Sequence, residues 1–139
     1  MARAVDETGE VTLHLPCEAR SVRAARQALE SLLRARRWRD VDIQGAQLAV
    51  TELVANAVVH ARSDLTVRIR VGSRALVEVS DRDAHAAVVP QAAAPDHQSG
   101  RGLLLVELVS RRWGVARGTN SKTVWCEVEP HAAAFRDAG

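Results

Sequence analysis

The chain has 139 residues, of which 47% are hydrophobic, a composition typical of one globular domain and not of a disordered protein. Its 19 basic and 17 acidic residues leave a formal net charge of +2, which argues against a dedicated nucleic-acid-binding protein. The sequence contains neither an apolar run long enough to span a membrane nor an N-terminal signal segment, so we expect a cytoplasmic protein without a membrane partner. Cys17 and Cys126 lack metal-ligand spacing and are expected to stay reduced.

The first part of the chain predicts a short strand and an amphipathic helix. Residues 11–15 alternate apolar and polar side chains until Pro16 ends the run. From Ser21, a residue type that favours helix N-caps, apolar residues recur at helical spacing to about residue 38. The arginine cluster at residues 34–39 is typical of a solvated helix end, and its alternative interpretation is a docking patch for an acidic partner.

Side-chain periodicity predicts the remaining elements. A helix is expected at residues 40–61, capped by Asp40 or Asp42, and a hairpin at 64–71 and 75–79, with Asp81 just beyond it. A short helix then opens at residues 99–102 and ends near Trp113. The last element is a hairpin at 113–117 and 122–128. Residues 82–99 contain two prolines, many alanines and no periodicity, so they are interpreted as a mobile loop. Because this segment lies between Asp81 and Gly100, we expect it to form a lid over a functional site.

The second helix carries the most informative stretch of the chain. Residues 48–61 are apolar almost all round a helical projection, so this helix should be buried on most of its surface. A polar stripe of Glu52, Asn56 and His60 interrupts that surface, and the first two point the same way because they are four residues apart. A buried acid and carboxamide must be paired, hydrated or bound to a ligand. The alternative is that the stripe is only the solvated edge of a core helix.

This order of elements predicts an α/β two-layer sandwich, with one mixed, largely antiparallel sheet and its helices on one face. The other face of the sheet is then open to a partner. We expect a single domain at residues 10–129, between a loose N-terminus at 1–9 and a loose tail at 130–139. Gly100 and Gly102 at a helix start let the backbone approach an anion, although a plain flexible helix start is the alternative.

Four motifs in this order resemble the GHKL family of ATPases, which includes gyrase and the histidine kinases. Residues 52–60 (ELVANAVVH) look like the N-box of that family, and Asp81 after a strand, residues 100–102 at a helix start and Lys122-Thr123 in a late strand follow in the family's order. Over residues 20–129 the chain looks most like the small anti-sigma-factor serine kinases and their actinobacterial relatives. The resemblance implies a histidine-kinase-like ATPase fold.

The resemblance implies three roles for the acidic and amide side chains. Asn56 would supply its amide oxygen to Mg²⁺, a hard cation that takes oxygen ligands. Asp81 would accept a hydrogen bond from the adenine amino group of ATP. Glu52 would act as the general base toward the attacking hydroxyl.

The resemblance also implies that residues of the short helix and of the last strand bind the nucleotide. Gly100, Arg101, Gly102 and Leu103, at the start of the short helix, would hold the phosphates. Thr123 would sit near the adenine end, with Lys122 beside it. The sequence differs from the family pattern at two places. Residues 82–85 after Asp81 contain none of the glycines usual in the family, and no glycine precedes Lys122.

Two classes of function follow from the resemblance. In the first, the protein is an anti-sigma factor that binds a sigma factor and uses ATP to phosphorylate a serine of an anti-sigma antagonist protein. In the second, it is a nucleotide-gated protein-binding module without phosphotransfer. A gyrase-type motor and a histidine-kinase core are disfavoured, because no transducer domain follows and no phospho-acceptor helix pair precedes. The resemblance also allows a homodimer.

Overall fold

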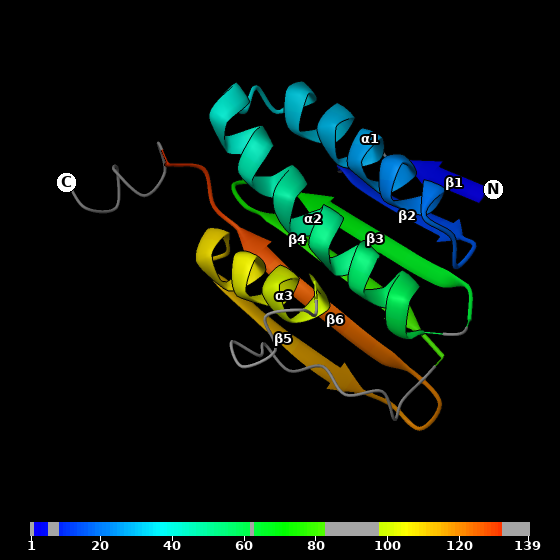
Figure 1. Ribbon diagram of the computed structural model, residues 1–139. Helices are drawn as coiled ribbons and strands as arrows, with labels where there is room; N and C mark the ends of the chain where they lie inside the picture. Colours follow the sequence, from blue (N-terminus) through cyan, green and yellow to red (C-terminus); the bar gives the residue numbers. More distant parts are fainter. Residues whose placement is uncertain (1, 6–8, 62, 83–97, 132–139) are drawn as a thin grey trace.

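The computed structural model describes residues 2–5, 9–61, 63–82 and 98–131, with residues 2–5 and 98–103 described by their backbone alone. Figure 1 shows its helices lying over one sheet. In chain order the elements are β1 (Ala2–Val5), β2 (Glu10–Leu15), α1 (Arg20–Ala35), α2 (Asp40–His60), β3 (Leu65–Val71), β4 (Ala75–Asp81), α3 (Gln98–Val109), β5 (Arg112–Arg117) and β6 (Lys122–Val128).

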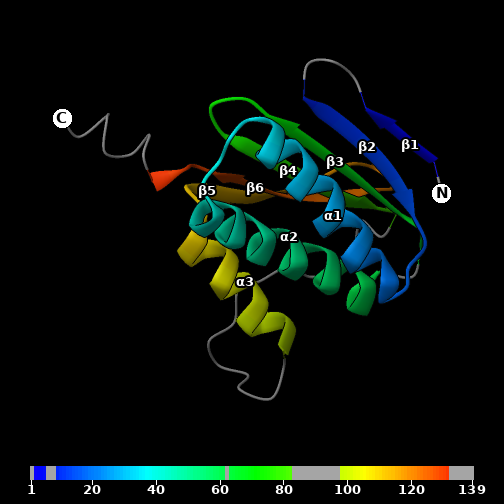
Figure 2. The same ribbon diagram turned by 90° about the horizontal axis from the view of Figure 1, so that it is seen from above.

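The described strands form one six-stranded sheet in the order β1-β2-β3-β4-β6-β5. Every neighbouring pair in it is antiparallel. The helices lie together on one face of this sheet, as the view in Figure 2 shows. The predicted two-layer α/β sandwich with a largely antiparallel sheet is therefore confirmed.

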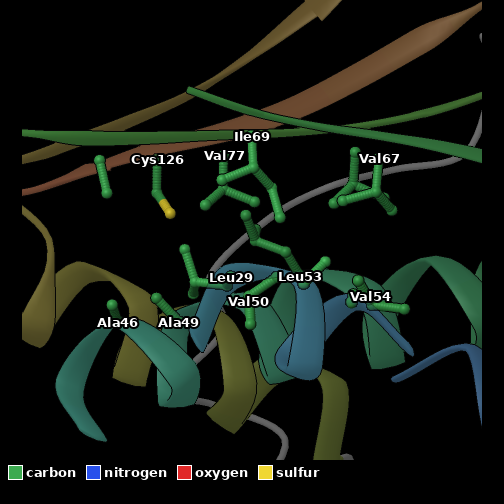
Figure 3. Close-up of a cluster of buried hydrophobic side chains, with 14 of the residues drawn as sticks. Leu29, Ala46, Ala49, Val50, Leu53, Val54, Val67, Ile69, Val77 and Cys126 are labelled. Carbon is green, nitrogen blue, oxygen red and sulfur yellow. The ribbon is translucent and has the colours of Figure 1, made fainter. Parts of the chain in front are cut away.

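The core lies between the sheet and the helices because each central strand buries alternate side chains. In β3 the buried positions are Leu65, Val67, Ile69 and Val71, and the positions between them face the other side of the sheet. Figure 3 shows Val67 and Ile69 pointing from the sheet toward the side chains of the helices, among them Leu53. Burying one such side chain contributes about 1.5–3 kcal/mol. This apolar layer holds the helices in place over the sheet.

Helix α2 is apolar almost all round because it lies between α1 and α3 and above the sheet (Figures 1 and 2). Its buried apolar residues are Ile43, Ala46, Ala49, Val50, Leu53, Val54 and Ala57. The alanines among them are small, so neighbouring elements can approach the helix closely. By contrast, α1 is amphipathic and exposes its arginine-bearing side.

Neither of the first two helices begins with the predicted side-chain cap. Ser21 Oγ instead donates a hydrogen bond to the carbonyl of Pro16 at 2.6 Å. At the start of α2, Asp40 does not cap the helix, and the buried Asp42 accepts a hydrogen bond from the backbone N–H of His131 at 3.0 Å. The side chains of Ser21 and Asp42 instead bond to backbone groups that lie outside their own helices.

The ends of the domain also differ from the sequence prediction. The prediction of a loose segment at residues 1–9 does not hold for residues 2–5, whose backbone pairs with β2 as an edge strand. This pairing satisfies a strand edge that would otherwise stay open. In the predicted tail, His131 contacts α2, and residues 132–139 lie outside the described residues.

The predicted loop at residues 82–99 falls mostly on residues 83–97, outside the described part of the chain. Helix α3 begins at Gln98 and ends at Val109, so it starts before the expected opening at Ser99 and stops before Trp113. Asp81 is the last residue of β4 and does not follow the strand as predicted.

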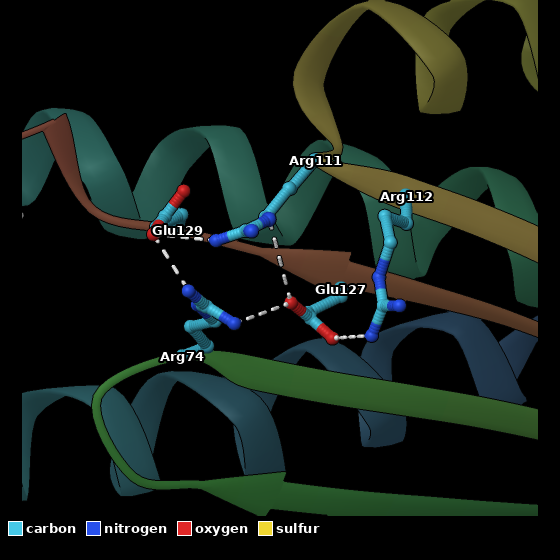
Figure 4. Close-up of polar contacts among 5 residues, drawn as sticks. All are labelled: Arg74, Arg111, Arg112, Glu127 and Glu129. Carbon is cyan, nitrogen blue, oxygen red and sulfur yellow. Dashed lines mark hydrogen bonds and ion pairs between the residues drawn. The ribbon is translucent and has the colours of Figure 1, made fainter. Parts of the chain in front are cut away.

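The outer face of the sheet is polar. It carries the ion pair of Arg70 with Glu78, whose atoms Nη2 and Oε1 are 3.3 Å apart. At the end of β6 lies an Arg–Glu cluster, shown in Figure 4, which consists of Arg74, Arg111, Arg112, Glu127 and Glu129. Among the described helices, none is both long and apolar enough to cross a bilayer.

Candidate functional site

The two ends of helix α2 lie over opposite ends of strands β4 and β6. At its N-terminal end, Asp42 is bonded to His131, just beyond the end of β6. The helix has 21 residues and is therefore about 30 Å long. Its C-terminal half thus lies toward the end of the sheet where β4 stops and β6 starts, as Figure 1 shows.

Specific contacts fix this arrangement. Cys17 Sγ donates a hydrogen bond to the carbonyl of Ala61 at 3.2 Å, which anchors the end of α2 to the turn before α1. The backbone N–H of Arg82 donates to Ser63 Oγ at 3.0 Å, which ties the end of β4 to the segment that follows α2. We call this end of the molecule, formed by the end of α2, the end of β4 and the start of β6, the Asp81 edge.

Glu52 and Asn56 lie on successive turns of the half of α2 that faces the Asp81 edge. Asn56 is only 5% exposed. A carboxamide at a buried position needs a hydrogen-bond partner, water or a ligand, so this position suits a side chain that binds a ligand. Glu52 is half-buried, and burial raises its pKa, as expected of a carboxylate withdrawn from water. The third residue of the stripe, His60, is exposed.

Asp81 and Lys122 form a buried ion pair at the edge itself. They are cross-strand partners in the register of β4 and β6, and their side chains are each 1% exposed. Lys122 Nζ lies 3.5 Å from Asp81 Oδ2. The site therefore contains a positive and a negative group side by side, on the face of the sheet that the helices cover.

Helix α3 directs its N-terminal turns toward the same end of the molecule. Its C-terminal end is held at the far end of β6, where the backbone N–H of Arg111 donates to the carbonyl of Glu127 at 2.8 Å. The helix packs along α2, so its start at Gln98 lies toward the Asp81 edge (Figure 1). Gly100, Arg101, Gly102 and Leu103 fall in these first turns, and only their backbone is described. Backbone N–H groups at a helix start favour an anion.

Thr123 is not brought together with Asp81. Side chains alternate along a strand, so Thr123 faces the outer side of the sheet while Lys122 faces the helices. The Thr123 hydroxyl lies 2.7 Å from that of Ser80, its cross-strand partner on the outer face. The residue that stands opposite Asp81 on the inner face is Lys122.

The Asp81 edge is chemically suited to a nucleotide with Mg²⁺, although it contains no complete metal cage. Within the described residues, no group of three or more His, Cys, Asp or Glu side chains is placed to hold a metal ion. Mg²⁺ is commonly bound through one or two protein oxygens together with phosphates and waters. The amide oxygen of Asn56 matches that preference.

The pairing of Lys122 with Asp81 was missed by the sequence reasoning. The two residues are 41 positions apart, and only the register between β4 and β6 brings them together. One signal was present, because Lys122 is the only lysine in a chain otherwise supplied with arginine.

Comparison with known proteins agrees with the geometry. The family model of the histidine kinase-like ATPase domain matches residues 15–127. A solved structure, described as the RsbU and RsbW domains of Rv1364c from Mycobacterium tuberculosis, is similar with a TM-score of 0.67 at 18% sequence identity, and the match covers 87% of this chain but 32% of that chain. No curated protein matches the sequence. Since the family match spans most of its length, the chain belongs to the histidine kinase-like ATPase domain family.

Proposed function

We propose that this protein binds ATP with Mg²⁺ at the Asp81 edge and acts as an anti-sigma factor with serine kinase activity toward an antagonist protein. The observation that carries the proposal is that the C-terminal half of α2, which bears Glu52 and Asn56, lies toward the end of the sheet where β4 ends at Asp81 (Figure 1). The fold alone does not specify a substrate, so the chemistry of these side chains has to support it.

Base recognition is assigned to Asp81. Its carboxylate is buried on the face of the sheet under the helices, where hydrogen bonds to a charged acceptor are strong. An adenine amino group donates to this carboxylate, and the start of α3 at residues 100–103 receives the phosphates on its backbone N–H groups.

The metal is assigned to Asn56. The residue is buried, and its amide oxygen is the kind of ligand that Mg²⁺ prefers. When bound, the metal supplies charge neutralisation to the phosphates. The protein contributes the rigid helix that keeps the amide oxygen in place.

Glu52 is assigned the role of general base. It lies one helical turn from Asn56, within about 6 Å along the helix face. Burial raises the pKa of Glu52, and a carboxylate with a raised pKa is a stronger proton acceptor. Its part in phosphotransfer is to orient the serine hydroxyl and remove its proton.

The partner is assigned by the same family likeness, as a sigma factor, an antagonist protein or both. The arginine cluster at residues 34–39 gives limited support, because Arg34 already pairs with Glu30 at 2.9 Å and with Asp40 at 3.0 Å. These contacts fit the interpretation of a solvated helix end. The polar outer face of the sheet is the larger open surface for a partner.

The test of nucleotide binding is isothermal titration calorimetry with ATP, with and without Mg²⁺. We expect Asp81→Asn to weaken ATP binding by about 10- to 150-fold, since losing a hydrogen bond to a charged acceptor costs about 1.5–3 kcal/mol. The matched control is Asp64→Asn, which changes an exposed aspartate. ATP affinity that is unchanged in Asp81→Asn, or no binding by the wild type, contradicts the proposal.

A second candidate is a nucleotide-gated binding module without phosphotransfer. It is favoured by residues 82–85, where the glycines usual after the aspartate in this family are missing. Labelled ATP incubated with the protein and candidate antagonist proteins separates the two functions. Phosphate on an antagonist serine supports the kinase, whereas ATP and partner binding without any transfer supports the module.

A further inference from the structure

Lys122 is unusual among the charged residues of this chain. It is the only lysine in the sequence, and its side chain is 1% exposed. The ion pairs of the Arg–Glu cluster, by contrast, involve arginines with side chains at least 40% exposed. We propose that Lys122 is a base-reading residue, whose ammonium donates to a ring nitrogen of the bound purine next to the group read by Asp81.

A buried ion pair is rarely retained for stability alone. Removing two charges from water costs several kcal/mol per ion, and well-packed apolar residues are often as good or better at such positions. Only a short, well-aligned contact with further hydrogen bonds offsets that cost. The distance of 3.5 Å between Lys122 Nζ and Asp81 Oδ2 is long for a charged hydrogen bond, which is usually about 2.7–2.9 Å.

The lysine also has unused hydrogen-bonding capacity. An ammonium has three N–H donors and no acceptor. Within the described residues, Lys122 Nζ is buried and makes no hydrogen bond. A buried donor of this kind is satisfied when an acceptor from a ligand enters the site.

Together the two side chains present a donor beside an acceptor. The Watson–Crick edge of adenine presents the complementary pair, the exocyclic amino donor beside the N1 acceptor. The amino group donates to Asp81, and N1 accepts from Lys122. This inference rests on the proposed nucleotide site, and it places Lys122 where Thr123, on the outer face of the sheet, cannot reach.

The pairing has a consequence for base selectivity. Guanine presents the two groups in the reverse order, with the O6 acceptor where adenine has its amino group and the N1–H donor where adenine has its N1 acceptor. In the pose that the two contacts set for adenine, O6 would face the Asp81 carboxylate and N1–H would face the Lys122 ammonium, so both contacts are mismatched. We therefore expect the discrimination between ATP and GTP to be larger in the wild type than in a variant whose residue 122 cannot donate.

The experiment uses an analogue that removes the acceptor from the ligand and leaves the protein unchanged. In 1-deaza-ATP the N1 nitrogen is replaced by C–H. We expect the wild type to bind it about tenfold or more weakly than ATP, as for the loss of a charged hydrogen bond. Lys122→Met should bind ATP as weakly as the wild type binds 1-deaza-ATP, and it should no longer distinguish the two ligands. Lys122→Gln retains an N–H donor and should be intermediate.

A second readout does not depend on any variant. Protein labelled with ¹⁵N only at lysine should give a single side-chain ammonium signal in NMR, because the sequence has one lysine. That signal should shift on addition of Mg-ATP and shift much less with 1-deaza-ATP at saturation. This measurement still decides the question if Lys122→Met fails to fold.

The outcomes separate the inference from the proposed function. If the wild type binds ATP and 1-deaza-ATP with equal affinity and the ammonium signal responds equally to both, Lys122 does not contact N1, and the nucleotide site stands without it. If the wild type binds no ATP, the proposed function and this inference fall together. Tenfold weaker binding of 1-deaza-ATP that disappears in Lys122→Met establishes the contact.

Discussion

The two ends of strand β6 place their charges in opposite ways. At its start, Lys122 faces Asp81 in a fully buried pair whose atoms are 3.5 Å apart. At its other end, the Arg–Glu cluster forms several contacts between exposed arginines and more buried glutamates, including one of 2.7 Å between Arg112 Nη2 and Glu127 Oε2 (Figure 4). One strand thus carries a single ion pair that is fully buried and a network of ion pairs that is partly open to water.

The difference separates stability from function. Ion pairs that are open to solvent contribute about 0–1 kcal/mol to the free energy of unfolding, and salt weakens them. The cluster therefore stabilises the contact of β6 with β5 and the β3–β4 turn only modestly. A buried pair at this distance adds little or nothing to stability, and the ammonium of Lys122 keeps N–H donors for a ligand. Helix α2 runs between the two ends, with Asp42 bonded to His131 at one and its C-terminal half, which carries Asn56, toward the other (Figure 1). Changes at the Asp81 edge should therefore alter activity, and changes at the cluster should alter stability alone.

The largest effect is expected for Glu52→Gln. Glutamine is nearly isosteric with glutamate and cannot accept the proton, and general-base catalysis is worth about 10²- to 10⁴-fold, so phosphotransfer should slow by that factor. ATP affinity and the thermal unfolding midpoint should stay close to those of the wild type. The assay is transfer of labelled phosphate to an antagonist serine under single-turnover conditions.

The matched control for this prediction is Glu107→Gln, which changes an exposed glutamate of α3 in the same helical layer. It should transfer phosphate at the wild-type rate. A similar rate for Glu52→Gln and the wild type would show that Glu52 is not the base. It would also break the assignment of chemistry to this end of the molecule.

Much of the fold was predictable from side-chain periodicity. The alternation in residues 65–71 and 122–128 reflects one buried face, so the bounds of β3 and β6 were nearly or fully correct. Residues 2–5 are too few to give a clear periodic pattern, and the structure identifies their strand through backbone pairing with the edge of β2. Ser21 was misassigned as a cap for a related reason, since its partner is the Pro16 carbonyl, a contact that local propensity cannot predict.

The site was predictable in part. Spacing along one helix predicted Glu52 and Asn56 on the same side, and the half of α2 that carries them lies toward the Asp81 edge (Figure 1). Whether Thr123 or Lys122 faces the helices depends on the register of β6. A register shift of one residue would exchange the two faces of the strand. The pair of Asp81 with Lys122 depends on the register between two strands joined through α3 and β5. Long-range register is the information that a single sequence does not show directly.

A smaller effect, on stability alone, is expected for Glu127→Gln in the cluster. Its Arg112 hydrogen bond lowers the pKa of Glu127 and outweighs the burial that would raise it. A lowered folded pKa gives stability that is present above the unfolded pKa and is lost as the pH falls through the folded value. We expect the variant to lose about 1 kcal/mol at neutral pH, with the loss shrinking in acid and in high salt. Urea unfolding measures this loss.

ATP affinity serves as the control for Glu127→Gln, and it should not change. An effect of this variant on nucleotide binding comparable to that of Asp81→Asn would mean that the two ends are coupled through β6. The separation of roles along the strand would then be wrong.

The smallest effect is expected for His131→Ala, at the contact between α2 and the residue beyond β6. Burial works to raise the pKa of Asp42, but the backbone N–H, ring and charge of His131 outweigh it and hold the pKa below its usual value. The ring of His131 is 72% exposed, so the solvent-screened loss on its removal should be only about 0.5 kcal/mol. The backbone N–H still donates to Asp42 in the variant, which limits the loss further.

The pH dependence of the His131 contact follows from the lowered pKa of Asp42. The stabilisation is present above the unfolded aspartate pKa of about 3.9 and is lost as the pH falls through the lower folded value. The difference in unfolding free energy between the wild type and His131→Ala should therefore be fully present at about pH 5 and shrink as the pH falls through the lowered folded pKa of Asp42. Urea titrations across this range measure it. A difference that grows in acid would mean that the ring acts through something other than the Asp42 carboxylate, and the start of α2 would then lack the charged anchor assigned to it.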